Sequence, residues 1–146
     1  MGKRKTKAAW DTLAVFCGVA AIGASAVAWV HSRGYTLYSG DAQAHLNIAR
    51  RVFDNRTPGF DQLGTVWLPL PHLLMLPLVG RDDLWRSGLA GAIPAALCFA
   101  IAAAFLYASA KRALECRPAA LAAVAVFALN PNLLYLQATP MTEPVF

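Results

Sequence analysis

Hydrophobic and small residues run almost without interruption through three stretches of the chain, at about 11–30, 84–110 and 118–137. About 20 such residues form a helix long enough to cross the roughly 30 Å hydrocarbon core of a bilayer. From Leu13 to Val30, only Ser25 interrupts the apolar and small residues. The pattern predicts an all-α membrane protein with about three transmembrane helices.

The first two stretches are separated by residues 31–83, an outer loop that holds a polar segment with helical periodicity at 38–51. A helix that begins near Ser39 or Asp41 places Asp41 and His45 on one face, four residues apart. The adjoining face is apolar and is formed by Ala42, Leu46, Ala49 and Phe53. We expect an amphipathic helix that lies along the membrane surface.

Asp41 has two interpretations at this helix start. Aspartate is a preferred N-cap, so the carboxylate can accept hydrogen bonds from the free N–H groups of the first turn. An acidic group beside an imidazole is also typical of a site where chemistry takes place. Residue type alone does not separate capping from catalysis, and both interpretations stay open.

Turn-forming residues at 54–59 end this helix, and an apolar stretch that contains three prolines follows at 65–79. About 15 residues are too few for a crossing, and the prolines disfavour a regular helix. We therefore expect an interfacial or re-entrant piece packed against protein. His72 within it is expected to be a partly buried interfacial histidine, because no second ligand stands at helical spacing.

The second long apolar stretch carries small residues at four-residue intervals, namely Gly88, Ala92 and Ala96. Such a face lets membrane helices approach closely. Pro94 is expected to bend this helix.

The third stretch is interrupted near its end by Asn130-Pro131-Asn132, which predicts a kink. Glu143 and Pro144 then indicate the start of another helix. We interpret the whole of residues 1–146 as the N-terminal portion of a larger multi-span domain.

Composition agrees with lipid as the main solvent. The chain is 58% hydrophobic and 14% charged, whereas soluble proteins have about 25% charged residues. A net charge of +5 is compatible with nucleic-acid binding, but the basic residues lie in clusters beside apolar stretches and do not form one patch. We therefore expect a lipid bilayer as partner and no nucleic acid. The three cysteines show no pairing or metal-binding spacing and are expected to be free thiols.

The basic clusters predict the orientation of the chain. Lys3, Arg4, Lys5 and Lys7 precede the first span, and Lys111, Arg112 and Arg117 follow the second. Positive residues stay on the cytoplasmic side, so we expect a multi-pass protein of the cell (inner) membrane with a cytoplasmic N-terminus. Asp41 and Glu143 would then lie outside. A cleaved signal peptide ending near Ala26 is the alternative, but apolar character continues to Val30.

Three segments resemble the front part of a known enzyme family. They are Y-S-G-D-A-Q-A-H-L at 38–46, T-P-G-F-D-Q-L-G-T-V-W-L-P-L-P-H at 57–72 and N-P-N-L-L-Y-L-Q-A-T-P-M-T-E-P at 130–144. Together they resemble the N-terminal part of bacterial membrane glycosyltransferases similar to the dolichyl-phosphate-mannose–protein mannosyltransferases. The resemblance implies a GT-C fold and a sugar taken from a polyprenyl-phosphate carrier on the non-cytoplasmic face. It also implies that Asp41 is the catalytic carboxylate.

The chemistry of the residues agrees with such a reaction. Inverting transfer needs a carboxylate that takes a proton from the acceptor while the carrier phosphate leaves the sugar. His45, Arg51 and Glu143 are the expected substrate-binding residues, and Arg51 is suited to a phosphate or a lipid headgroup. No cofactor is certain, and a divalent cation held by Asp41, His45 and Glu143 stays open. The acceptor is unknown, and we expect the chain alone to be inactive.

A non-enzymatic membrane scaffold or a transporter fragment is the alternative function. Several spans, an interrupted helix and a Pro-rich apolar stretch suit that class in a general way. A transporter is expected to place ionisable groups near the middle of the membrane, and none lies centrally in the three stretches. This pattern favours the enzyme.

Overall fold

The computed structural model describes the backbone of residues 2–64 and 66–146 and the side chains of residues 9–64 and 66–146. Within these ranges the chain forms helices and turns and contains no strand, which confirms the all-α prediction. The α-helices are α1 (Gly2–Ser32), α2 (Gly40–Arg50), α3 (Pro69–Val79), α4 (Asp82–Ser87), α5 (Leu89–Leu114), α6 (Arg117–Ala128) and α7 (Pro131–Gln137). Two 3₁₀ turns are η1 (Phe60–Gln62) and η2 (Glu143–Val145). The side chains of the basic run at 3–7, used above to predict orientation, lie outside the described residues.

Two helices are long and apolar enough to cross a membrane, Ala9–Ser32 of α1 and Leu89–Leu114 of α5. Helices α6 and α7 make a third if they are taken as one span, and they are bent by 63° at the break between them. The side chain of Asn130 accepts hydrogen bonds from the backbone N–H groups of Asn132 and Leu133 and so caps α7. The predicted kink at Asn130-Pro131-Asn132 is confirmed.

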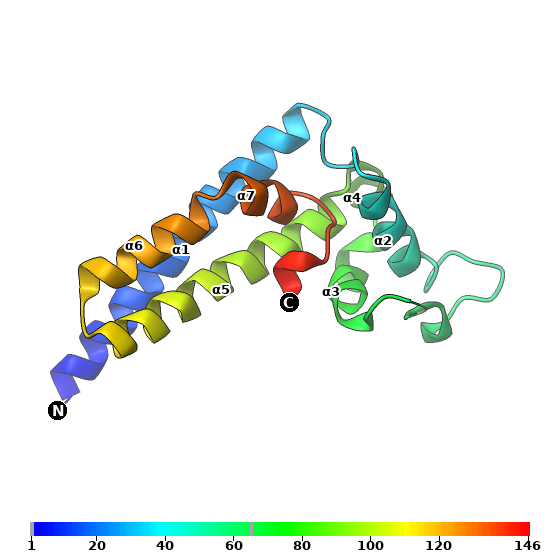
Figure 1. Ribbon diagram of the computed structural model, residues 1–146. Helices are drawn as coiled ribbons and strands as arrows, with labels where there is room; N and C mark the ends of the chain where they lie inside the picture. The colour runs from blue at the N-terminus through cyan, green and yellow to red at the C-terminus, as the bar shows by residue number, and fades with distance from the viewer. Residues whose placement is uncertain (1, 65) are drawn as a thin grey trace.

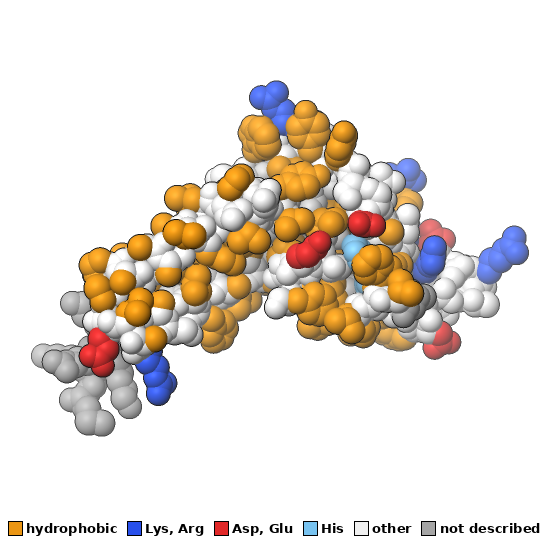
Figure 2. Space-filling view, viewed as in Figure 1, with side chains coloured by type: hydrophobic (Ala, Val, Ile, Leu, Met, Phe, Trp, Pro, Cys, Tyr) orange, Lys and Arg blue, Asp and Glu red, His pale blue; other side chains and the backbone are white. Residues whose placement is uncertain are grey.

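Helices α1, α5 and α6 lie side by side as an elongated bundle, and α2, α3 and α4 gather at one end of it (Figure 1). The bundle core combines small and large apolar residues, formed by Val19, Phe99, Ala100, Ala103, Tyr107, Ala120, Val124 and Ala128. Figure 2 shows hydrophobic side chains along the length of the bundle and charged side chains at its two ends. This distribution is typical of helices that cross a bilayer.

Small residues do pack between helices, and part of the predicted face is among them, because Ala92 is fully buried and Ala96 is half-buried. Gly88 is not part of α5; it adopts a left-handed conformation with φ of +81° and separates α4 from α5. A Cβ atom at this position would lie 2.6 Å from Cγ2 of Thr36, so both the backbone and the neighbouring side chain require glycine. The predicted helix at 84–110 is therefore two helices. Pro94 lies inside α5, which continues through it.

The opposite end of the bundle is joined by ion pairs. Asp11 of α1 lies 2.8 Å from Nζ of Lys111, near the end of α5, and 3.1 Å from a guanidinium nitrogen of Arg117, at the start of α6. The start of α1 and the turn between α5 and α6 thus lie at one end of the bundle. Helix α2 and the end of α7 lie toward the other end, as the order of the spans predicts (Figure 1).

Helix α2 packs against α3 and does not merely lie along a surface. A second apolar core, separate from that of the bundle, joins them to the start of α5 through Leu46, Ala49, Met75, Val79 and Ala90. Most of the predicted apolar stripe is buried as expected. Phe53 is the exception: it lies beyond the end of α2 and is 52% exposed, whereas Ile48 and Val52 are buried.

The Pro-rich stretch forms a regular helix from Pro69 onward, so the prediction of irregular structure is wrong for α3. Pro69 and Pro71 fall in the first turn of the helix, where backbone N–H groups have no partner within the helix. Only Pro77 lies in the interior. The 11 residues of α3 are too few for a crossing, as predicted. Thr65, at the start of the stretch, lies outside the described residues.

Candidate functional site

Asp41 is exposed in the first turn of α2, at the end of the bundle where α1 finishes. The N-cap of this helix is Ser39, which has extended backbone angles of −81° and 135°. Because Gly40 and Asp41 are already helical, the interpretation of Asp41 as the cap is wrong. Its carboxylate still lies at the positive end of the helix dipole, where a negative charge is favourable. Asp41 is therefore available for contacts outside the helix.

His45 follows one helical turn after Asp41 and is only 2% exposed. Its Nδ1 lies 3.0 Å from Nε2 of His72, which is fully buried on α3. The indole of Trp67 meets the His45 ring edge-on, with 4.7 Å between ring centroids. We refer to His45 and His72 as the histidine pair.

The histidine pair corrects the interpretation of His72. The sequence predicted a partly buried interfacial histidine and not a ligand, because no second ligand stands at helical spacing. Its partner is 27 residues away, on a different helix. The residue pattern within one segment gives no sign of this contact. One signal in the sequence is that two apolar or amphipathic segments of the outer loop each carry a histidine.

Both histidines are poor bases for their type. Burial lowers the pKa of His72 to about 4, and the His45 ring lowers it in the same direction. The carbonyl of Leu68 opposes this effect, although Nδ1 of His72 has no well-aligned hydrogen bond. Burial also lowers the pKa of His45, while the negative charges of Asp41 and Glu143 act to raise it. The pair is therefore neutral near pH 7.

Glu143 reaches this site from the far end of the described chain. It begins η2, which packs against α5, and it is exposed. The segment approaches α5 closely at Gly91, where an added Cβ atom would lie 2.5 Å from Cβ of Pro140. Figure 2 shows acidic side chains on either side of a histidine on this face. The negative charges of Asp41 and Glu143 both act on the His45 ring, so the structure brings these three residues near one another.

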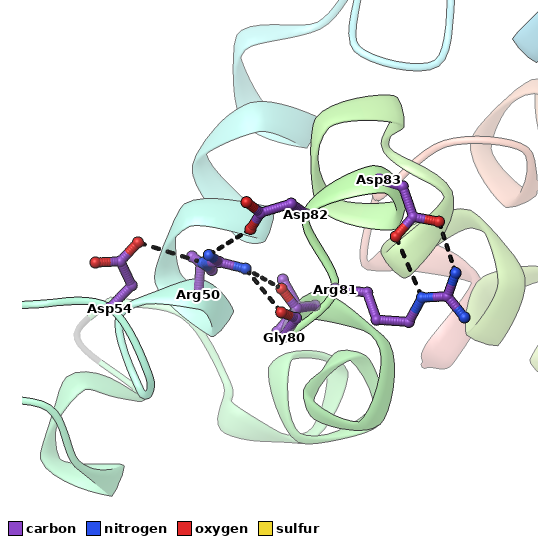
Figure 3. Close-up of polar contacts among 7 residues, drawn as sticks. Arg50, Asp54, Gly80, Arg81, Asp82 and Asp83 are labelled. Carbon is purple, nitrogen blue, oxygen red and sulfur yellow. Dashed lines mark hydrogen bonds and ion pairs between the residues drawn. The ribbon is translucent and has the colours of Figure 1, made fainter.

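Arg50, the last residue of α2, and the adjacent Arg51 differ in their contacts. Arg50 donates hydrogen bonds to the carbonyls of Val79 and Gly80 at 2.9 and 3.1 Å and to Asp82 at 2.6 Å (Figure 3). Its guanidinium also pairs with Asp54 at 3.5 Å and lies 5.0 Å from the centre of the Trp85 ring. These contacts hold the end of α2 against the turn between α3 and α4, so Arg50 has a structural role. We call Arg50 and these partners the Arg50 cluster.

Arg51 is exposed at the C-cap of α2. Ten residues of helix separate it from Asp41, a distance of about 15 Å along the axis. The structure therefore does not bring the two backbone positions together, and the substrate-binding role of Arg51 stays a prediction.

A pocket of about 580 Å³ opens between three tyrosines, Tyr35, Tyr38 and Tyr135. Its volume is in the range of small-molecule sites, roughly 300–1,000 Å³. Tyr38 lies just before α2, three residues from Asp41, and the rings of Tyr35 and Tyr38 meet edge-on with centroids 6.1 Å apart. The sequence gives no sign of this pocket, because Tyr135 belongs to α7 and lies far along the chain from Tyr35 and Tyr38.

The site has no ready-made ligand set for a metal. Among the side chains that the structure describes, no three histidine, cysteine or acidic groups are arranged to hold an ion. The three cysteines, at 17, 98 and 116, are free thiols, as predicted.

Comparison with models of protein families, with characterised proteins and with solved structures finds no match to this chain.

Proposed function

We propose that the protein is a membrane glycosyltransferase that moves a sugar from a polyprenyl-phosphate carrier to an acceptor. The observation that supports this proposal is the setting of Asp41. It is an exposed carboxylate at the end of a membrane-spanning bundle, beside a buried neutral histidine and a second carboxylate, Glu143. A water-soluble acceptor and a lipid-anchored donor can meet at such a place.

In the proposed reaction, Asp41 accepts the proton of the acceptor hydroxyl. The hydroxyl oxygen forms a bond to the anomeric carbon as the bond from that carbon to the carrier phosphate breaks. The product has inverted configuration, because attack and departure occur on opposite faces of the sugar. An exposed carboxylate held on a helix of fixed position is suited to this role.

His45 does not act as a positively charged group toward the departing phosphate. Because burial lowers its pKa, the ring is neutral near pH 7 and cannot balance the charge of a departing phosphate. We propose instead that His45 forms a hydrogen bond within the site. Arg51 is the proposed contact for a lipid headgroup or phosphate at the membrane surface.

The tyrosine pocket is the proposed site for the sugar or the acceptor. Tyrosine offers a flat apolar ring and a hydroxyl that donates and accepts hydrogen bonds, which matches the two kinds of surface of a sugar. Tyr38 is exposed by 79%, so the pocket is open to an incoming molecule.

The proposal requires Asp41 and Glu143 to lie on the non-cytoplasmic side, with the N-terminus inside. Single cysteines placed at 41 or 111 in a background without Cys17, Cys98 and Cys116 can be labelled in intact cells with a membrane-impermeant reagent. We expect labelling at 41 and protection at 111. The reverse pattern would contradict both the orientation and the proposed function.

The central test is Asp41→Asn, assayed for sugar transfer in membranes that contain the complete enzyme. Asparagine preserves the size of the side chain but cannot take a proton, so we expect transfer to fall by at least about 100-fold. Glu115→Gln is the control, because Glu115 is an exposed acidic residue in the turn between α5 and α6, at the opposite end of the bundle. Near-normal transfer by Asp41→Asn would refute the assignment of the catalytic carboxylate.

A further inference from the structure

The surroundings of the histidine pair determine where its protons lie. A neutral imidazole carries a hydrogen on one ring nitrogen, and the other nitrogen is an acceptor. Since Nδ1 of His45 and Nε2 of His72 are 3.0 Å apart, one of them donates and the other accepts. Two arrangements of the neutral pair are therefore available.

In the first arrangement, Nδ1 of His45 donates to Nε2 of His72, and the hydrogen of His72 is on its Nδ1. In the second, Nε2 of His72 donates, and its Nδ1 presents a lone pair in a fully buried place. The Leu68 carbonyl lies near the His72 ring and favours a hydrogen on it. The second arrangement sets a buried lone pair near that carbonyl oxygen, which is unfavourable. The first arrangement is thus preferred.

We propose that His72 holds His45 in the form whose Nε2 carries no hydrogen, and that His45 is a second proton acceptor beside Asp41. The part played in the reaction rests on the proposed glycosyl transfer. After Asp41 has taken the proton of the acceptor hydroxyl, the O–H bond of its carboxyl group breaks and an N–H bond forms at Nε2 of His45. Asp41 is a carboxylate again, and the imidazolium then releases the proton to water.

The charges around His45 support this direction of transfer. Asp41 on its own helix and Glu143 on η2 both stabilise a positive charge on the ring, while burial limits its lifetime. In this proposal one water passes the proton between Asp41 and His45. His45 would be a catalytic residue, and His72, which acts through it, a positioning residue.

A purely structural pair would hold α2 against α3 without regard to which nitrogen bears the hydrogen. The position of the hydrogen can be observed directly, because nitrogen NMR distinguishes a ring nitrogen that bears a hydrogen from one that does not. The chain has three histidines, His31, His45 and His72, so a sample labelled with ¹⁵N only in histidine is simple to assign.

The first experiment records these spectra on the full chain in lipid nanodiscs at neutral pH. We expect His45 to carry its hydrogen on Nδ1 with a bare Nε2, and His72 to carry its hydrogen on Nδ1. His72→Gln retains an amide oxygen that accepts from Nδ1 of His45 and should keep this form. His72→Leu removes the acceptor and should yield a mixture of forms of His45. His31→Gln is the matched control, since His31 is exposed at the end of α1, and it should leave the pair unchanged.

A hydrogen on Nε2 of His45 in the unaltered chain would overturn the proposal. Bound zinc detected in the purified protein, with both histidine nitrogens shifted to metal-bound positions, would also overturn it in favour of a metal site.

The second experiment measures sugar transfer by the complete enzyme across pH. We expect His45→Gln to lower the rate by about 100-fold, the lower end of the contribution of a positioned acid–base group. His72→Leu should lower it less and change the pH profile, and His72→Gln should restore much of the rate. A near-normal rate for His45→Gln would overturn the catalytic role. If the unaltered enzyme transferred no sugar, the proposed function would fail, while the nitrogen spectra would still decide the state of His45.

Discussion

The helical bundle and the α2–α4 region are stabilised by different kinds of contact. In the bundle, α1, α5 and α6 meet through alanines and a few large side chains, such as Phe99 and Phe127, whose rings stack 5.0 Å apart. In the α2–α4 region, a small apolar core is supplemented by the histidine pair and by the Arg50 cluster. Close packing of small residues dominates in the first region, and directional polar contacts contribute strongly in the second.

The difference follows from helix length and solvent. Helices within lipid form their own hydrogen bonds and associate chiefly through close packing. Helices α2, α3 and α4 have 11, 11 and 6 residues, too few to be stable alone in water. They need contacts between segments that are far apart in the sequence. The candidate site lies in this second region, so its geometry depends on polar contacts that pH and single substitutions can break.

The largest expected effect is a loss of stability of the α2–α4 region at acid pH. The pKa of His72 falls from an ordinary 6.5 to about 4 on folding, so between these values the unfolded chain binds a proton that the folded chain does not. Stability from this group is complete above pH 6.5 and is lost as the pH falls toward 4. The loss is about 3 kcal/mol, since each pKa unit corresponds to about 1.4 kcal/mol.

Hydrogen exchange of α2 and α3 amides in nanodiscs, from pH 7.5 to 4, measures this effect. The lowered pKa of His45 adds to it in the same direction. His72→Leu should reduce the pH dependence, and the amides of α1 and α5 should show much less of it. If hydrogen exchange depended equally on pH in both regions, the expected difference between them would be refuted.

The second expected effect concerns the contact between α5 of the bundle and the segment that carries Glu143. Gly91 packs on Pro140, and a Cβ atom there would lie 2.5 Å from Cβ and 2.8 Å from Cα of the proline. Gly91→Ala should therefore displace the segment that carries Glu143, at a cost of about 2 kcal/mol. Gly18→Ala is the control, because no atom lies within 4 Å of a Cβ atom at Gly18. Thermal unfolding in nanodiscs that is equal for the two variants would refute the close contact.

The sequence predicted the bundle better than the site, for a physical reason. An apolar run long enough to cross lipid is a local property, so the spans and the break at Asn130 were visible. Gly88 was misassigned because a long apolar stretch follows it directly and only the fold requires its positive φ. In α3, the prolines were given too much weight, because two of them occupy first-turn positions that tolerate proline.

Within the site, local pattern correctly brought Asp41 and His45 near each other, since they are one turn apart on one helix. The local pattern could not show that His45 contacts His72, that Arg50 donates hydrogen bonds to the turn after α3, or that Tyr135 and Tyr38 line one pocket. Each of these contacts joins segments more than 25 residues apart. Helical periodicity relates only residues within one segment.

The third expected effect tests whether polar contacts hold the α2–α4 region. Arg50→Met removes the donors to the Val79 and Gly80 carbonyls and leaves Asp82 without its close partner. The expected loss is about 1.5 kcal/mol, the lower end for hydrogen bonds to a charged group, because Asp82 is largely exposed. Arg51→Met is the matched control at the adjacent exposed position. Hydrogen exchange at residues 69–87 should increase in the first variant only, and equal exchange in both would deny the Arg50 cluster a structural role.

The smallest expected effect tests the converse, that the bundle depends little on its polar contacts. Asp11 pairs with Lys111 and Arg117, and the side chains of these two partners are 31% and 57% exposed. In Asp11→Asn the amide oxygen still accepts a hydrogen bond, and water solvates both cations, so the loss should be about 1 kcal/mol or less. Thermal unfolding in nanodiscs at low and high salt measures it, with little change expected between the two. A loss larger than that of Arg50→Met would show that ion pairing, and not apolar packing, holds the bundle together.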